Sequence, residues 1–175
     1  MNRVRSPALL LAPMLALLAV PLAGCGLHPL YAGGGSGRVA MALAQVEVAP
    51  IEGKAGYLVG NAIKDRLANT RGNTPLYRLE IKLDDKIIGL GVRSDDTITR
   101  ERRTLRARYQ LIDLANGAVL LDATAGSDAG VDVVGSEYAT IAAEDTALER
   151  LSAIVADQII ARMALYAERT SPPGS

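Results

Sequence analysis

Two neighbouring segments of this 175-residue chain alternate strictly between apolar and polar residues, and this constrains the fold most. They cover residues 77–84 and 100–111, and the apolar positions are odd-numbered in both. Because successive side chains of a strand point to opposite faces, the pattern predicts two strands of an antiparallel sheet with one buried and one wet face. The apolar residues are Tyr77, Leu79, Ile81, Leu83, Leu105, Ala107, Tyr109 and Leu111.

Asp84-Asp85 breaks the alternation of the first segment and predicts a bulge or the end of that strand. Residues 87–92 could continue it, and residues 93–96 predict a turn-like loop.

The turn after the second segment contains Asn116-Gly117, a pair typical of two-residue hairpin loops. Such a loop would place the apolar Leu111 opposite Asp122, whereas a three-residue loop pairs it with Leu121. A slip of one residue exchanges the two faces, so burial should select an odd loop. We predict a turn of three or five residues, with Gly117 in the left-handed conformation.

The flanking segments complete an α+β fold. Alternation predicts a short strand over 43–48, and apolar residues spaced by three or four predict helices over 54–70 and 139–167. A strand over 118–125 and a small, acidic loop over 126–137 lie between them. The order β-α-β-β-β-α predicts a two-layer sandwich, a mostly antiparallel four-stranded sheet with two helices on one face.

The first 24 residues have the order of a bacterial signal peptide. Arg3 and Arg5 precede an apolar run over 8–20, which is too short to span a bilayer. Leu22-Ala23-Gly24-Cys25 then matches the pattern at which lipoproteins are cleaved before a lipidated cysteine. The alternative is an ordinary secretory signal with an incidental cysteine.

Cleavage would leave three regions: a lipidated N-terminus and flexible tether at 25–42, a single domain at 43–168 and a disordered tail at 169–175. The mature chain would carry 17 basic and 19 acidic residues, a net charge of −2. That balance gives no electrostatic reason to bind nucleic acid. Cys25 is the sole cysteine, so no intrachain disulfide is expected.

Four arginines share the polar face of the second strand and form the candidate site. Guanidinium groups match phosphate bidentately, so this row could bind the phosphates of a glycolipid head group. The alternative is a solvated face neutralised by Glu80 and Asp84, with Arg103 as a stray charge on the other face. The row consists of Arg100, Arg102, Arg106 and Arg108.

Catalytic and metal-binding patterns are not found in the sequence. It holds no G-x-S-x-G, P-loop or H-E-x-x-H motif, and the sole histidine, His28, lies beside the predicted anchor without partner ligands. We therefore expect no enzyme activity, no metal and no cofactor.

Two segments resemble a known family. Cys25–Tyr31, with the sequence Cys-Gly-Leu-His-Pro-Leu-Tyr, is one, and residues 138–147 leading into Leu151 and 156–159 are the other. They resemble the start and the C-terminal helix of the lipopolysaccharide-assembly lipoprotein LptE, also called the rare lipoprotein B type, particularly its shorter alphaproteobacterial members.

The resemblance implies a periplasm-facing lipoprotein of the outer membrane. Such proteins plug the large β-barrel LptD, help it to assemble and take part in inserting lipopolysaccharide into the outer leaflet. Gly26 is compatible with sorting to the outer membrane. Two alternatives remain: an accessory lipoprotein of a lipid-transport system at the inner membrane, and a lipid-anchored hydrolase, which a deep pocket with a serine or an acid pair would favour.

Overall fold

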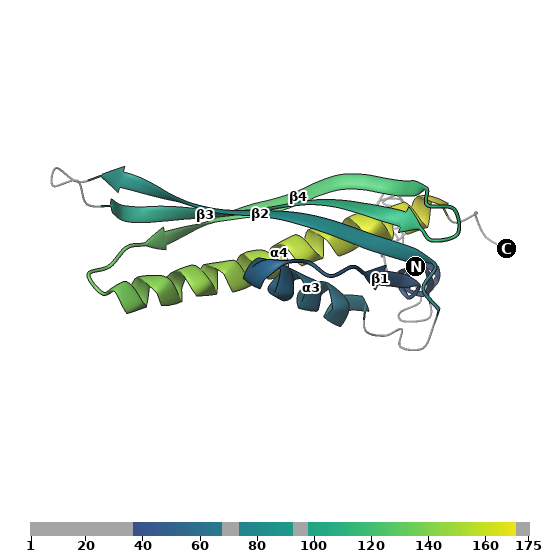
Figure 1. Cartoon of the computed structure of the whole chain (residues 1–175), viewed down its shortest axis with the longest axis horizontal. Helices are drawn as coiled ribbons and strands as arrows, with labels where there is room; N and C mark the ends of the chain where they lie inside the picture. The colour runs from purple at the N-terminus through teal and green to yellow at the C-terminus, as the bar shows by residue number, and fades with distance from the viewer. Residues whose placement is uncertain (1–36, 68–73, 93–97, 171–175) are drawn as a thin grey trace, which may run out of the picture.

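The computed structural model describes residues 37–67, 74–92 and 98–170 as a four-stranded sheet with helices on one face (Figure 1). The strands lie in the order β1-β2-β3-β4, with β1 parallel to β2 and the other pairs antiparallel. This confirms the predicted α+β class, the element order and the mostly antiparallel sheet. The elements are α2 (Arg38–Leu43), β1 (Val46–Val48), α3 (Gly53–Leu67), β2 (Tyr77–Val92), β3 (Ile98–Asp113), β4 (Val119–Asp132) and α4 (Glu137–Thr170).

The odd-numbered side chains of β2 and β3 face the helices, as the alternation predicted. Leu79, Leu105 and Tyr109 are at most 1% exposed. Asp84-Asp85 neither ends nor bulges β2, because both residues keep their partners in the β2–β3 ladder. The prediction of an interruption there was wrong.

β4 is longer than predicted. Residues 126–132 are strand, not loop, and pair with β3 up to the pair Asp132↔Arg100. Glycine and aspartate have low strand propensity, but ladder hydrogen bonds and neighbouring side chains override it here. The real connection to α4 covers only residues 133–136.

The β3–β4 hairpin has the predicted pairing. Leu111 pairs with Leu121 and Tyr109 with Ala123, and five residues separate the two strands. Gly117 has a φ of 72°, and its N–H donates to the Asp113 carbonyl at 2.8 Å. Burial of Leu111 therefore decides the register, and the two-residue turn is excluded.

The core lies between the sheet and the helices α3 and α4. Leu148, Leu151, Val155, Ile159 and Met163 are at most 1% exposed, which confirms the predicted buried stripe of the long helix. A helix of 34 residues is about 51 Å long and runs under the whole length of the sheet in Figure 1.

The N-terminal part differs in detail from the prediction. Arg38–Leu43 forms the helix α2, so the strand predicted from residue 43 begins only at Val46. Leu43 is buried, since α2 packs against α4. The signal peptide, Cys25, His28 and the helix stop predicted at residues 71–73 lie outside the described residues.

Candidate functional site

The even-numbered residues of β3 form one row on the sheet face that the helices leave open. They include the four predicted arginines, all of which the structure brings onto this face. Residues on β2 and β4 with the same orientation flank the row. In this article the open face means these even-numbered positions: 78–90 of β2, 100–110 of β3 and 122–132 of β4.

Aspartates of β4 pair with three of the four arginines. Arg108 Nη2 lies 3.0 Å from Asp122 Oδ2, and Arg106 Nη2 lies 3.2 Å from Asp128 Oδ2. Arg100 contacts Asp132 at 3.4 Å. The predicted neutralising residues, Glu80 and Asp84, do not make these contacts, since the acids come from the opposite neighbouring strand.

Two uncharged side chains of β3 strengthen this arrangement. Thr104 Oγ1 donates to Asp128 at 2.7 Å, and Gln110 Nε2 donates to Asp122 at 2.8 Å. The Arg108 and Gln110 hydrogen bonds lower the pKa of Asp122. The bonds from Thr104 and Arg106 likewise lower the pKa of Asp128. Both carboxylates therefore stay ionised at neutral pH.

Arg102 differs from its three neighbours. It lies opposite Gly130 on β4 and Ile88 on β2, and among the described residues it makes no ion pair within 4.0 Å. A shallow hollow of about 260 Å³ opens further along the row, lined by Glu80, Lys82, Arg108 and Gln110. The open face therefore offers an exposed guanidinium without a carboxylate partner and a polar depression.

Glycines of β4 make room for the arginine side chains. A Cβ at Gly126 would lie 2.5 Å from Arg106 Cδ, so the Arg106 stem occupies the space of a side chain there. At Gly130 the nearest Arg100 atoms would be 3.5 Å away, an ordinary contact. The alternation of aspartate and glycine on β4 thus fits the arginines of β3.

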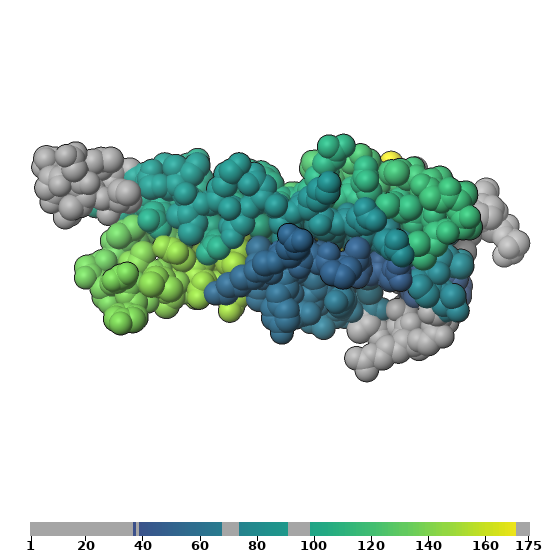
Figure 2. Space-filling model, viewed as in Figure 1, coloured from purple at the N-terminus to yellow at the C-terminus, as the bar shows by residue number. Residues whose placement is uncertain are grey.

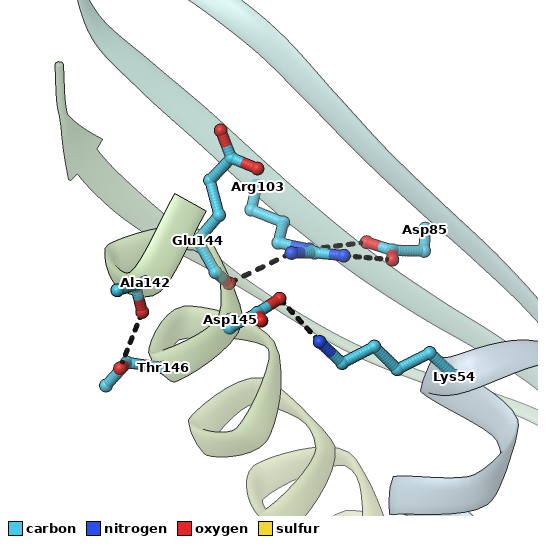
Figure 3. Close-up of polar contacts among 7 residues, drawn as sticks. All are labelled: Lys54, Asp85, Arg103, Ala142, Glu144, Asp145 and Thr146. Atoms are coloured by element: carbon cyan, nitrogen blue, oxygen red, sulfur yellow. Dashed lines mark hydrogen bonds and ion pairs between the residues drawn. The ribbon is translucent and has the colours of Figure 1, made fainter. Parts of the chain in front are cut away.

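Arg103 is not a stray charge. It lies on the helix face, is 8% exposed, and binds Asp85 of β2 with two nitrogens (Figure 3). Its Nη1 donates to the Glu144 carbonyl oxygen of α4 at 2.9 Å. Nearby, Lys54 of α3 pairs with Asp145 of α4 at 2.6 Å. These contacts join two strands and two helices, so their role is structural.

The largest apolar hollow lies at the other end of the sheet. It measures about 290 Å³, and Leu43, Tyr77, Met163 and other residues of α2, the strands and α4 line it. The lining includes one carboxylate, Asp113, and, within the described ranges, neither a serine nor a second acid. It therefore gives no support to the hydrolase alternative.

Two further searches cover only the described residues. Within 37–67, 74–92 and 98–170 no helix is long and apolar enough to cross a bilayer. The same ranges bring together no group of three or more potential metal-ligating side chains.

Sequence reasoning missed the acidic partners of the arginine row. Asp128 and Asp132 were assigned to a loop, although their even spacing continues the alternation of Asp122 and Thr124. Following that spacing would have identified them. The contact of Arg103 with α4 has no comparable signal in the sequence, because it depends on where a distant helix packs.

The fold and the site define a class of small α+β domain whose sheet has one helix-covered face and one charged face. The chain belongs to the LptE family, described as lipopolysaccharide-assembly, whose model matches residues 43–163. This confirms the resemblance seen in the sequence. No curated protein matches the chain significantly.

Solved structures share the fold. A putative lipoprotein from Caulobacter crescentus CB15 is 28% identical, with a TM-score of 0.64, over 77% of this chain and 98% of that one. A minor lipoprotein from Acinetobacter baumannii is 12% identical, with a TM-score of 0.57, over 70% and 92%. The rare lipoprotein B from Shewanella oneidensis is 11% identical, with a TM-score of 0.56, over 71% and 96%. The last two likenesses concern the fold alone.

Proposed function

We propose that this chain is an outer-membrane lipoprotein that plugs the LptD β-barrel, assists its assembly and takes part in inserting lipopolysaccharide into the outer leaflet. The family match over residues 43–163 carries this proposal. The role is one of binding and positioning rather than catalysis. The chain faces the periplasm and has three partners: the barrel, lipopolysaccharide and, through its acyl groups, the membrane.

Anchoring depends on Cys25. Each buried methylene contributes about 0.8 kcal/mol, so two or three acyl chains hold a protein durably where one does not. Metabolic labelling with a fatty acid should mark the wild-type chain and leave Cys25→Ser unlabelled. Separation of the two membranes should then place the labelled protein in the outer membrane. Recovery in the inner membrane would favour the alternative, an accessory lipoprotein of a lipid transporter.

The open face supports the role as a plug. Its charges are mostly paired within the sheet, as between Arg108 and Asp122, so the face is hydrophilic without a large net charge. The lumen of a large outer-membrane barrel is itself polar and wet. Affinity purification of the lipidated protein from membranes should recover a large β-barrel, and depletion of the lipoprotein should stop that barrel from maturing.

We assign lipopolysaccharide phosphates to the arginine row. Arg102 is exposed and lacks an acidic partner among the described residues, so it can bind a phosphate without first breaking an ion pair. Arg106 lies two positions further along the same row of β3, beyond Thr104, and shares Asp128 with it. A phosphate dianion can compete for an exposed guanidinium of this kind.

Charge reversal tests this assignment. Arg102→Glu combined with Arg106→Glu should weaken lipopolysaccharide binding and reduce its dependence on salt, because two phosphate contacts are lost. The matched control reverses Lys64 and Arg150, two exposed cations on the helices, with the same change in net charge. Equal binding by wild type and the Arg102/Arg106 variant at low salt would remove the site and leave the family assignment intact.

A further inference from the structure

Strand β2 has a long edge that no other strand covers. β1 pairs with only three of its residues, Tyr77 to Leu79. The Tyr77 N–H donates to Gln45, and the Leu79 carbonyl accepts from Ala49, so odd-numbered backbone groups point toward this edge. By the alternation of an antiparallel ladder, those of the odd residues between 81 and 89 also point outward.

The same edge is exposed and partly apolar. Six consecutive residues, 84–89, are exposed, among them Ile87 at 41% and Ile88 at 54%. In Figure 2 the atoms of β2 and β3 beyond the end of β1 have no other element in front of them. An unpaired strand of this kind is a template for a further strand, and natural proteins normally cover or interrupt it.

The charges along the edge are self-complementary. If a second copy pairs antiparallel about a two-fold axis at Asp85, Asp84 of each copy faces Lys86 of the other. On the helix side of the sheet, Leu83 faces Ile87. A shift by two residues in either direction sets Asp84 against Asp84 or Lys86 against Lys86, and like charges directly opposite are destabilising.

We propose that this chain forms a symmetric homodimer through the β2 edge, by antiparallel pairing of residues 81–89 centred on Asp85. The residues at the centre contribute outward backbone groups, as the hydrogen-bonded positions of such a pair require. In the monomer Lys86 Nζ binds Asp84 of its own strand at 2.7 Å, and in the dimer each makes that contact across the axis. The interface is isologous, so it closes at two copies.

The surrounding structure limits the pairing to this stretch. β1 occupies the edge at 77–79, so a partner strand can reach no further than about Ile81. In the proposed register Ile81 faces Gly89, which sets the other end at the same point. The inference does not rest on the anchor or on the barrel, because it uses only the described residues of one edge.

Exchange of charges provides the experiment, on the mature chain purified from membranes in detergent and measured by sedimentation over a concentration series. Lys86→Glu sets two acids opposite each other at both symmetric positions, and Asp84→Lys sets two cations there. Each single variant should raise the dimer dissociation constant by about tenfold or more, which is a loss of ~1.4 kcal/mol. The double variant D84K/K86E should restore it.

Mixing the two single variants distinguishes this register from others. One copy with Asp84→Lys and one with Lys86→Glu present complementary pairs at both positions, so the mixture should form heterodimers that neither variant forms alone. Asp132→Lys on the opposite edge, with the same charge change as Asp84→Lys, is the control and should leave the dimer unchanged. Thermal unfolding should show that all variants are folded.

Three results would overturn the proposal. The first is a wild-type chain that sediments as a monomer at every concentration, which would leave the edge to a foreign strand. The second is a dimer that Lys86→Glu does not weaken. The third is a mixture of the two single variants that stays monomeric.

Discussion

The guanidinium of Arg103 holds the carboxylate of Asp85 with two hydrogen bonds, 2.9 Å from Nε and 2.6 Å from Nη2, between the sheet and α4. The two side chains are only 10% and 24% exposed. The third nitrogen binds the Glu144 carbonyl, so one side chain connects β2, β3 and α4 (Figure 3). The hydrogen bonds to Asp85 raise the pKa of Arg103, which stays charged throughout the accessible pH range.

Arg103→Met should destabilise the fold by about 3 kcal/mol, because it leaves a largely buried carboxylate without its partner. The measurement is urea unfolding at neutral pH. Arg102→Met, on the next residue and the open face, is the matched control and should change the free energy of unfolding little. The double change Arg103→Met with Asp85→Leu should recover part of the loss, since no charge then stays buried. A single variant as stable as wild type would contradict the structural role.

Glu144 should make the stability depend on pH in an unusual direction. Burial, and then the nearby Glu101 carboxylate, raise the pKa of Glu144 above its ordinary value of 4.5. One oxygen of Glu101 is buried without a hydrogen-bond partner among the described residues. Because the folded-state pKa is raised, the protonated form favours folding, and this contribution is lost as pH rises through the raised value.

Glu144→Gln should therefore be more stable than wild type at pH 7, and the difference should vanish below the ordinary glutamate pKa. Thermal unfolding from pH 3.5 to 8 measures this. Asp145→Asn, the adjacent acid on α4, should instead lose its 2.6 Å contact with Lys54 and gain nothing at neutral pH. A Gln variant that is less stable than wild type at pH 7 would show that the Glu144 carboxylate is favourable as an ion.

The parts of the fold that could be predicted are those that a period of two or 3.6 residues determines. Alternation placed Arg102 and Arg106 on one face, and burial of Leu111 determined the hairpin register. The distal part of β4 escaped prediction, because glycine and aspartate form a strand only when a neighbouring strand holds them. The partner of Arg103 escaped for a related reason, since Glu144 is distant in sequence and helix packing brings it there.

Two glycines of α3 on one helix face should respond oppositely to alanine. The sequence predicted a close approach of another element to both, and the structure shows that it is the residue Ile51, just before the helix. A Cβ at Gly56 would lie 2.6 Å from the Ile51 carbonyl oxygen, whereas at Gly60 the nearest contact would be an ordinary 3.8 Å.

Gly56→Ala should cost about 1–3 kcal/mol, because the chain before the helix must move. Gly60→Ala should instead stabilise the protein by up to about 1 kcal/mol through higher helix propensity. Chemical unfolding of the two variants measures the contrast. Equal effects would mean that helix propensity alone decides at both positions.

Gln158 of α4 protects the middle of the other sheet edge. Its Oε1 accepts the Gly126 N–H at 2.9 Å, and its Nε2 donates to the Gly126 carbonyl at 3.3 Å, the same pair of bonds that a fifth strand would make. Gln158→Ala should therefore expose this amide, and its hydrogen exchange should accelerate by about tenfold, equivalent to the ~1 kcal/mol of a typical hydrogen bond. The neighbouring amide of Ala125 points toward β3 and is the internal control, which should not change. Equal acceleration at both amides would indicate general fraying of β4 instead of the loss of one specific contact.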